Sequence, residues 1–276
     1  MWVKSFSSDF DPMPIITLTT DFGYRDGFVG TVKGVILGIA PDVQLVDLTH
    51  SISPQNILEG AMVLWRAAPF FSPGTVHLAI VDPGVGTQRR PLAARIRDQF
   101  FVGPDNGLFT LFMEDAEKRG EDSIFINLNN PKYFLPKVSF TFHGRDIFGP
   151  IAAHLVKGVK LEALGDRIMD PVRIKMLKPE KTADGWIAHI TMVDVFGNLT
   201  TDLPANDVID KGKVEFRLCG KTIHGMVESY SIKHPGDLIA LVNSENYVEV
   251  STVNGSAAQT LNAKAGDPIS VKMEEK

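Results

Sequence analysis

The sequence predicts an N-terminal α/β domain with a mainly parallel sheet, followed by a C-terminal all-β, barrel-like domain. Over roughly the first 165 residues, short β-branched apolar runs alternate with helical repeats of apolar residues. A stretch rich in Pro, Lys and Asp follows, and beyond it come only short alternating runs separated by Gly, Asn and Asp. Strands that alternate with helices are typical of a parallel sheet covered on both faces. Closely spaced short strands are typical of a small barrel or sandwich.

The first domain is expected over residues 14–165, a linker over 166–185, and the second domain over 186–276. In the first domain, β-branched runs predict strands at 15–19, 43–46, 75–81, within 93–102 and at 124–128. Helical spacing and capping signals predict helices at 28–40, from Ser53-Pro54 to Ala68, after Gly107 and at 146–157. In the second domain, strands are expected at 187–195, 213–218, 238–242, 247–250 and 269–273, with no helix.

Composition narrows the classes of function. With 276 residues, 44% hydrophobic and 22% charged, the chain can bury a substantial core. A net charge of −5 argues against a nucleic-acid partner. The single cysteine, Cys219, excludes an internal disulfide and fits a reducing, cytoplasmic compartment, and its apolar neighbours predict packing within a strand. No signal peptide is recognised and no apolar run approaches the ~20 residues of a membrane span, so no membrane partner is expected.

Two motifs place a carboxylate directly after a predicted strand, where ligands gather in open α/β sheets. In Thr20-Asp21-Phe22-Gly23, the carboxylate can accept two hydrogen bonds from a vicinal diol such as a ribose. Asp21 can instead cap the next helix, and for Asp26 the capping role is the favoured interpretation.

The second motif runs from Asp82 to Thr87 as Asp-Pro-Gly-Val-Gly-Thr, with Arg89 two residues further on. Its proline and glycines allow a ligand to approach the backbone closely. The segment lacks the lysine and the spacing of a phosphate-binding loop, so a nucleoside triphosphate is not implied. Taken alone, Arg89 and Arg90 are also compatible with a solvated basic pair.

A third motif, Phe142-His143-Gly144, is followed by Arg145-Asp146. A histidine in this setting is either a catalytic group or a packed, hydrogen-bonded residue, and the following pair can be a surface salt bridge of little energetic value. The seven histidines show no metal-binding spacing, so no metal is expected.

The second domain contributes Asp194-Val195-Phe196-Gly197-Asn198 at the end of a predicted strand. An acid, an aromatic ring and an amide so close together can bind an ammonium group, stack on a purine and read its edge. A plain β-turn uses the same residue types, so both interpretations remain open.

Taken together and in order, these motifs, with Phe196-Gly197-Asn198-Leu199-Thr200-Thr201 and Asn254-Gly255-Ser256-Ala257-Ala258, resemble the S-adenosylmethionine (SAM) hydroxide adenosyltransferase family. The resemblance extends over residues 14–273. It implies an α/β domain followed by a β-barrel. It also implies a homotrimer whose active sites lie between the first domain of one subunit and the second domain of its neighbour.

The resemblance also implies roles for individual residues. Asp82, Arg89 and His143 match the triad that handles water. The positions that match substrate contacts are Asp21 at the ribose, Asp194 at the methionine amine, Phe196 and Asn198 at the adenine, and Asp26 and Ser244 at the methionine end. Phe142 and Gly144 are also expected to bind the substrate, with Phe142 lining a dry pocket. Glu245 departs from the pattern, because the related fluorinase has an arginine there for the substrate carboxylate.

The expected reaction is hydrolysis of SAM to adenosine and L-methionine by in-line attack of an activated water on C5′. SAM is the substrate, and no cofactor is expected. Either Asp82 or His143 can take the proton from the water. The alternatives are a SAM-dependent halogenase, against which Asp82 and His143 argue because halogenases carry tyrosines there, and a non-catalytic protein that binds SAM or adenosine.

Overall fold

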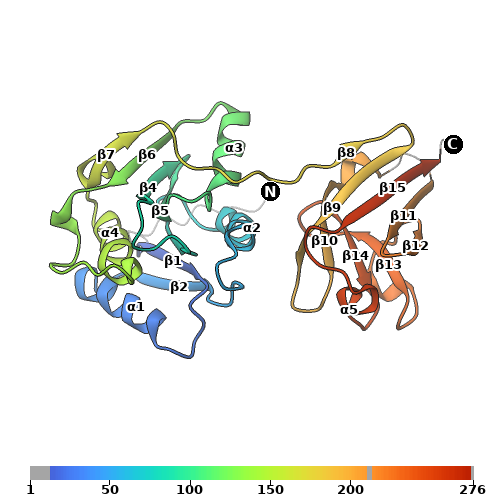
Figure 1. The fold of residues 1–276 in the computed structure, drawn as a ribbon, viewed down its shortest axis with the longest axis horizontal. Helices are drawn as coiled ribbons and strands as arrows, with labels where there is room; N and C mark the ends of the chain where they lie inside the picture. The colour runs from blue at the N-terminus through green and yellow to red at the C-terminus, as the bar shows by residue number, and fades with distance from the viewer. Residues whose placement is uncertain (1–12, 210–212, 275–276) are drawn as a thin grey trace, which may run out of the picture. The chain divides into compact units, whose positions relative to one another are not determined.

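The computed structural model describes residues 13–209 and 213–274. The chain divides into two compact units, Met1–Ile174 and Lys175–Lys276. The first unit contains alternating helices and strands, and the second is built mainly of strands (Figure 1).

The first unit contains a seven-stranded sheet with the order β2-β1-β3-β5-β4-β6-β7. The strands are β1 (Ile15–Thr20), β2 (Gln44–Thr49), β3 (Val76–Ile80), β4 (Pro91–Ile96), β5 (Gln99–Pro104), β6 (Ser123–Leu128) and β7 (Gly165–Ile168). Neighbours from β2 to β5 pair in parallel, whereas β4 is antiparallel to β5 and β6, and β7 is antiparallel to β6. Five of the seven strands therefore run in one direction, which confirms the prediction of a mainly parallel sheet.

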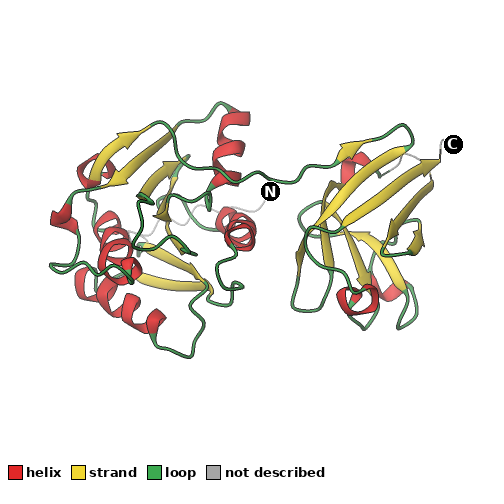
Figure 2. Cartoon of the chain, viewed as in Figure 1, coloured by secondary structure: helices red, strands yellow, loops and turns green. Residues whose placement is uncertain are grey.

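Helices cover both faces of this sheet (Figure 2). The helices α1 (Phe28–Ile39) and α4 (Gly149–Val156) pack on one face, and α2 (Ile57–Ala67) and α3 (Thr110–Arg119) pack on the other. Strand side chains alternate between the two cores, as the two-residue period of a strand requires. On β3, for example, Leu78 joins the core beneath α1 and α4, whereas Ala79 joins the core beneath α2 and α3.

Two helices begin differently from what the sequence suggests. Helix α2 begins at Ile57 because the side chain of Asn56 accepts a hydrogen bond from the backbone N–H of Glu59 at 3.1 Å and so caps the helix. The helix expected from residue 146 begins instead as a π-helical turn, Gly144–Phe148, which continues into α4. Such turns are frequent at functional sites.

The expected linker over 166–185 is largely built into the two units. The segment 166–168 belongs to β7, and residues that follow are tied to the first unit: the N–H of Val172 donates to Asp105 at 2.7 Å and that of Ile174 to Thr110 at 3.0 Å. These bonds come from residues more than 60 positions away, which local composition does not reveal.

The second unit forms an antiparallel, nearly closed, barrel-like sheet with the order β12-β11-β15-β9-β10-β14-β13, and β8 pairs with β9. The strands are β8 (Glu180–Lys181), β9 (Gly185–Val193), β10 (Leu199–Pro204), β11 (Lys213–Leu218), β12 (Lys221–His224), β13 (Leu238–Val242), β14 (Tyr247–Thr252) and β15 (Pro268–Glu274). This architecture confirms the predicted all-β second domain.

Two expectations for the second unit are wrong. A short helix, α5 (Ala257–Leu261), is present because Ser256 caps it by accepting a hydrogen bond from Gln259 N at 3.1 Å. Cys219 does not pack within a strand. It is exposed, with a φ of 47°, in the tight turn between β11 and β12.

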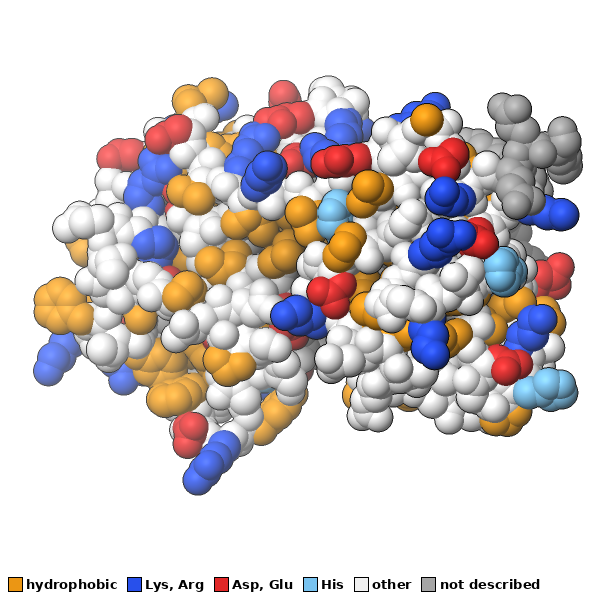
Figure 3. Space-filling view, turned by 45° about the vertical axis from the view of Figure 1, so that its right-hand side comes forward, with side chains coloured by type: hydrophobic (Ala, Val, Ile, Leu, Met, Phe, Trp, Pro, Cys, Tyr) orange, Lys and Arg blue, Asp and Glu red, His pale blue; other side chains and the backbone are white. Residues whose placement is uncertain are grey.

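On the face shown in Figure 3, acidic and basic side chains of the described residues are intermixed, with no extended basic surface. Among the helices of the described ranges, none is long and apolar enough to cross a membrane.

Candidate active site

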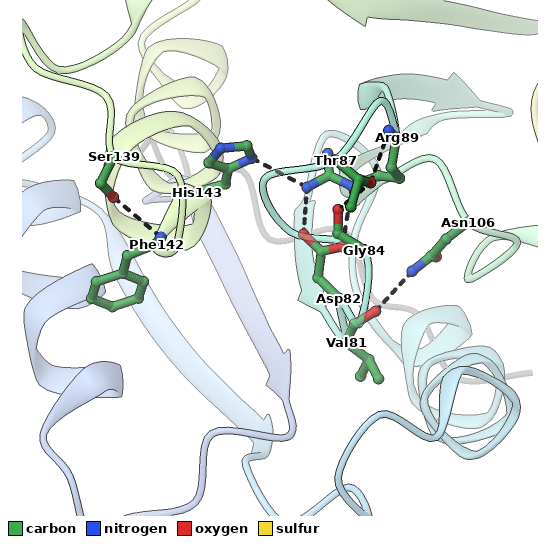
Figure 4. Close-up of polar contacts among 9 residues, drawn as sticks. All are labelled: Val81, Asp82, Gly84, Thr87, Arg89, Asn106, Ser139, Phe142 and His143. Atoms are coloured by element: carbon green, nitrogen blue, oxygen red, sulfur yellow. Dashed lines mark hydrogen bonds and ion pairs between the residues drawn. The ribbon is translucent and has the colours of Figure 1, made fainter.

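An arginine–carboxylate pair lies in the loop that follows β3. The guanidinium of Arg89 donates from Nε to Asp82 Oδ1 at 3.1 Å and from Nη2 to Asp82 Oδ2, so the contact is bidentate (Figure 4). Both side chains are almost inaccessible, with exposed fractions of 8% for Arg89 and 6% for Asp82. Arg89 is also stacked over the buried ring of Phe148, with 5.3 Å from Cζ to the ring centroid. A planar guanidinium suits this combination of bidentate pairing and stacking.

His143 joins this pair from the other side. Its Nδ1 lies 3.2 Å from Arg89 Nη2. Because a guanidinium can only donate hydrogen bonds, Nδ1 must be the acceptor, and the ring is then neutral in this arrangement. Burial lowers the pKa of His143 below its usual range, and the positive charge of Arg89 lowers it further, while Asp82 and Asp146 act in the opposite direction. The structure thus joins the acid, the guanidinium and the imidazole that the sequence singled out.

Short-range contacts fix the loop that carries Asp82 and Arg89. The hydroxyl of Thr87 donates to Gly84 O at 2.7 Å and accepts from Arg89 N at 3.3 Å. Below the loop, Asn106 Nδ2 donates to Val81 O at 2.8 Å. The side chain of Asn106 therefore supports the strand end from which Asp82 projects.

A glycine lets the loop of Asp82 and Arg89 approach the segment that leads into His143. Gly86 has a φ of +76°, and a Cβ at this position would lie 2.3 Å from the backbone oxygen of Phe140. Any other residue would force the Asp82–Arg89 loop away from the segment that leads into His143.

A pocket of about 250 Å³ opens between these loops. It is lined by Asp21, Phe22, Gln55, Ile80, Asp82, Pro83, Val85, Thr141, Phe142, His143 and Gly144. Five of the predicted site residues are among them, and Arg89 contacts two of these five. Ligand pockets span roughly 300–1,000 Å³, so this one matches part of a nucleoside-sized ligand.

The two acidic residues predicted near the ribose and the methionine end differ in position. Asp21 lines the pocket, and its Oδ2 accepts a hydrogen bond from Gln55 N at 2.8 Å. It does not cap α1, whose N-cap is Gly27 without any side-chain cap. Asp26 is exposed, does not line the pocket and does not serve as the N-cap.

Two charged residues do not lie free on the surface, as the simplest interpretation of the sequence suggests. Arg90 is not simply solvated, because it binds Asp105 at 2.7 Å and Asp170 at 2.9 Å. Asp146 is not part of a surface salt bridge, since its side chain is fully buried. No local signal distinguishes a buried Arg-Asp dipeptide from an exposed one.

In the second unit, Asp194 organises a tight turn. Its Oδ1 accepts from the backbone N–H of Phe196 at 2.9 Å and of Asn198 at 2.8 Å, and its Oδ2 accepts from Asn198 Nδ2 at 2.8 Å. This arrangement agrees with the β-turn interpretation. It leaves the ring of Phe196 73% exposed, as a stacking surface requires.

This turn packs against the segment Asn254-Gly255-Ser256-Ala257-Ala258. A Cβ on Gly197 would lie 2.0 Å from Ser256 Oγ, and Ala258 N donates to Gly197 O at 2.9 Å. Ser244 is exposed in the hairpin loop between β13 and β14, where Asn243 Oδ1 accepts from the backbone N–H of Glu245 at 3.0 Å.

A residue near the Asp194 turn was missed by the sequence analysis. The hydroxyl of Tyr230 donates to Glu249 at 2.7 Å, and burial, this hydrogen bond and the charges of Glu249 and Asp194 raise the pKa of Tyr230 to about 12.

A larger cavity of about 780 Å³ lies in the second unit and is lined by residues that fall between positions 208 and 242 of the sequence. None of the predicted site residues lines it. In the described part of the chain, no three His, Cys, Asp or Glu side chains come together as metal ligands would.

Comparison with known proteins identifies the family. The family model of the SAM hydroxide adenosyltransferase N-terminal domain matches residues 16–165, and that of the C-terminal domain matches residues 188–270. The chain belongs to the SAM hydroxide adenosyltransferase family. Curated relatives named (R)-S-adenosyl-L-methionine hydrolase include one from Salinispora tropica, which is 36% identical over 264 residues, covering 94% of this chain and 98% of the relative. Another, from Methanocaldococcus jannaschii, is 35% identical over 274 residues, covering 95% and 97%.

This chain is also similar to more distant proteins with another name and to a solved structure without a functional name. A fluorinase from Nocardia brasiliensis is 28% identical over 295 residues, covering 94% of this chain and 97% of the fluorinase. The crystal structure of an uncharacterized conserved protein from Thermotoga maritima superposes with a TM-score of 0.86 at 36% identity, covering 94% of this chain and all of that one.

Proposed function

We propose that this chain hydrolyses S-adenosyl-L-methionine to adenosine and L-methionine by in-line attack of water on C5′. The observation that carries the proposal is the nearly inaccessible Asp82–Arg89 pair with His143 bonded to the same guanidinium, beside a pocket at the carboxyl end of β3. The names of curated relatives that are about 35% identical over most of the chain support the same reaction.

The chemistry demands little on the leaving-group side. The sulfonium carries a positive charge and departs as neutral methionine, so no general acid is required there. The nucleophile is the difficult part, because bulk water has a pKa of ~15.7. Arg89 Nη1 is buried and makes no hydrogen bond to the described residues, so its N–H groups can stabilise a developing hydroxide. Holding the water in line can contribute about 7–11 kcal/mol of barrier lowering.

We assign the proton to Asp82. His143 Nδ1 accepts from Arg89, so in the neutral ring the proton is on Nε2 and no ring nitrogen offers a free lone pair. The Asp82 carboxylate retains acceptor capacity beyond its two contacts with Arg89 and lines the pocket. His143 then acts by holding Arg89 in place and by donating from Nε2.

Substrate binding is proposed to use both units. In the first unit, Asp21 receives the ribose hydroxyls, and Phe142 and Gly144 flank the reacting carbon. In the second unit, Phe196 stacks on adenine, Asn198 binds its edge, and Asp194 and Ser244 face the methionine amine and its surroundings, with Asp26 at the methionine end. The 250 Å³ pocket is smaller than such a substrate needs. We therefore propose a homotrimer in which neighbouring subunits complete each site, testable as a solution mass three times that of the chain.

The names of these relatives specify the (R) epimer. We propose the same preference here. Incubation with the separated (R) and (S) sulfonium epimers should consume the (R) form faster, and equal rates would contradict the preference.

The decisive experiment is chromatography of SAM incubated with the purified protein in ¹⁸O-labelled water. Adenosine carrying ¹⁸O at the 5′-hydroxyl, together with methionine, is the expected result. Adenosine without the label would exclude attack of water at C5′. A parallel incubation with chloride or fluoride should yield no 5′-halo-5′-deoxyadenosine. A protein that binds SAM and returns it unchanged would instead be a binding protein.

A further inference from the structure

A buried carboxylate outside the expected triad lies under the segment that carries His143. The side chain of Asp146 is fully buried. Its Oδ2 accepts from Ser139 N at 2.8 Å and from Ser139 Oγ at 2.6 Å, and Arg145 donates to its two oxygens at 2.6 and 3.1 Å. Burial raises the pKa of Asp146, but the hydrogen bonds from Arg145 and Ser139 outweigh it, so the pKa is lowered and the group stays ionised. A buried charge is costly unless it is hydrogen-bonded, and these four hydrogen bonds stabilise the Asp146 carboxylate in its buried position.

Ser139 transmits the position of this carboxylate to His143. While its hydroxyl donates to Asp146, the same oxygen accepts from the backbone N–H of Phe142 at 3.2 Å (Figure 4). Phe142 directly precedes His143 in the chain. The serine is thus bonded to the carboxylate on one side and, on the other, to the backbone that leads into the histidine.

The same segment is held from two further directions. Leu135 N donates to Asp146 O at 2.9 Å, which closes the loop behind the carboxylate. On the opposite side, Gly86 packs against Phe140 O, so that a Cβ there would come within 2.3 Å. The loop from residue 135 to 146 is therefore restrained at both of its sides.

We propose that Asp146 and Ser139 are positioning residues: they hold the His143 ring where its Nδ1 accepts from Arg89, and through it they keep the guanidinium aligned on Asp82. Hydrogen bonds run from Asp146 through Ser139 to the backbone of Phe142, and from the adjoining His143 through Arg89 to Asp82. A misplacement of about 1 Å in such a constellation can cost roughly 10²-fold in rate. This role deepens the proposed hydrolysis and rests on it.

Because charged groups surround His143, a movement of its ring would change its pKa. Burial and the charge of Arg89 lower its pKa, whereas Asp82, Asp146 and the Ser139 backbone raise it. A ring released from this place would lose its burial and its proximity to Arg89, so its pKa would move upward toward 6.5. Loss of the Asp146 charge without any movement would instead move the pKa downward.

The test compares Ser139→Ala, Ser139→Thr and Asp146→Asn with the wild type by steady-state kinetics of SAM hydrolysis and by NMR titration of His143. We expect S139A to lower kcat roughly 10- to 100-fold with KM changed less than about threefold, and to raise the His143 pKa. S139T, which keeps the hydroxyl, should restore both. D146N should resemble S139A.

Asp202→Asn is the matched control. Asp202 is also a buried carboxylate that accepts a backbone N–H, from His189 at 2.7 Å, and it binds His189 Nδ1 at 3.0 Å in the second unit. This variant should lose stability while kcat and the His143 titration stay as in the wild type. If D146N does not fold, the comparison of S139A with S139T, neither of which changes a charge, still tests the proposal.

Unchanged kcat and unchanged His143 pKa in S139A would overturn the positioning role. So would a fall in kcat without a change in the titration, or a downward pKa shift in D146N beside a wild-type-like S139A. A wild-type protein that forms no adenosine would refute the proposed function. In that case the NMR titration would still decide whether Ser139 and Asp146 position the ring.

Discussion

Arg89 offers the sharpest test of the proposed active site. It makes three hydrogen bonds with a side chain that is 8% exposed: two to Asp82 and one to His143 at 3.2 Å. A lysine keeps the charge but lacks the planar fork, so it can reach Asp82 or His143 but not both in the observed geometry. Arg89→Lys therefore loses at least one hydrogen bond of a charged group, worth about 1.5–3 kcal/mol. At 1.36 kcal/mol per tenfold, kcat should fall roughly 10- to 150-fold.

Removal of the charge should cost more. In Arg89→Met no donor remains for a developing hydroxide, and kcat should fall about 10²–10³-fold. The same variant leaves Asp82, 6% exposed, without its partner, and the free energy of unfolding should drop by about 3–5 kcal/mol. Adding Asp82→Asn to this variant should recover part of the stability but none of the activity.

The assay is adenosine formation from SAM, with kcat and KM measured separately, and chemical denaturation for stability. Arg90→Lys is the matched control, because the neighbouring arginine also binds carboxylates, Asp105 and Asp170, but neither of its partners lines the pocket. It should keep kcat within about threefold, since it makes no contact in the transition state. If R89K and R90K had equal activity, or if R89K changed only KM, the role assigned to Arg89 would be wrong.

Three further outcomes are expected. Gly86→Ala should lower kcat and lower the free energy of unfolding by about 1–3 kcal/mol. Gly74→Ala is the control, because Gly74 has a similar φ of +81° but no atom within 4 Å of an added Cβ, so only the smaller cost of the backbone conformation is expected. Equal effects of the two substitutions would show that the contact of Gly86 with Phe140 is unimportant. Burial lowers the pKa of His77 to about 4, so as pH falls from about 6.5 the unfolded chain binds the proton first and the free energy of unfolding should drop by up to about 3 kcal/mol. Urea unfolding between pH 7 and 4.5 should show this slope, and His77→Gln should flatten it. Phe196→Ala, at a 73% exposed ring, should raise KM for SAM without lowering the melting temperature, and an unchanged KM would argue against adenine stacking.

Much of the fold could be predicted because its causes are local. Apolar residues spaced three and four apart produced α1, and β-branched runs produced β1 and β3 where they were expected. The candidate site was predicted for a related reason. Asp21 and Asp82 follow β1 and β3, which pair with each other in parallel, and parallel strands bring their carboxyl ends to one edge. Two residues 61 positions apart in the sequence then line one pocket.

Other features have no local signature. Asp146 and Arg90 look like surface charges in the sequence, but distant residues bury the first and pair the second. The π-helical turn Gly144–Phe148 that leads into α4 has no side-chain cap, so no capping signal in the sequence marks where it begins. The bonds that tie residues up to Ile174 to the first unit come from Asp105 and Thr110, so composition alone described that segment as a linker.

The sequence by itself determined which elements form, which loops bear an acid, an arginine and a histidine, and which family the motifs resemble, because each of these depends on residues within a few positions of one another. Only the tertiary structure decided that one guanidinium joins Asp82 to His143, that Gly86 lets the two loops touch, and that a buried Asp146 lies under the histidine. Burial and hydrogen-bond partners are set by contacts across the fold, and these contacts determine which charged residues can do chemistry.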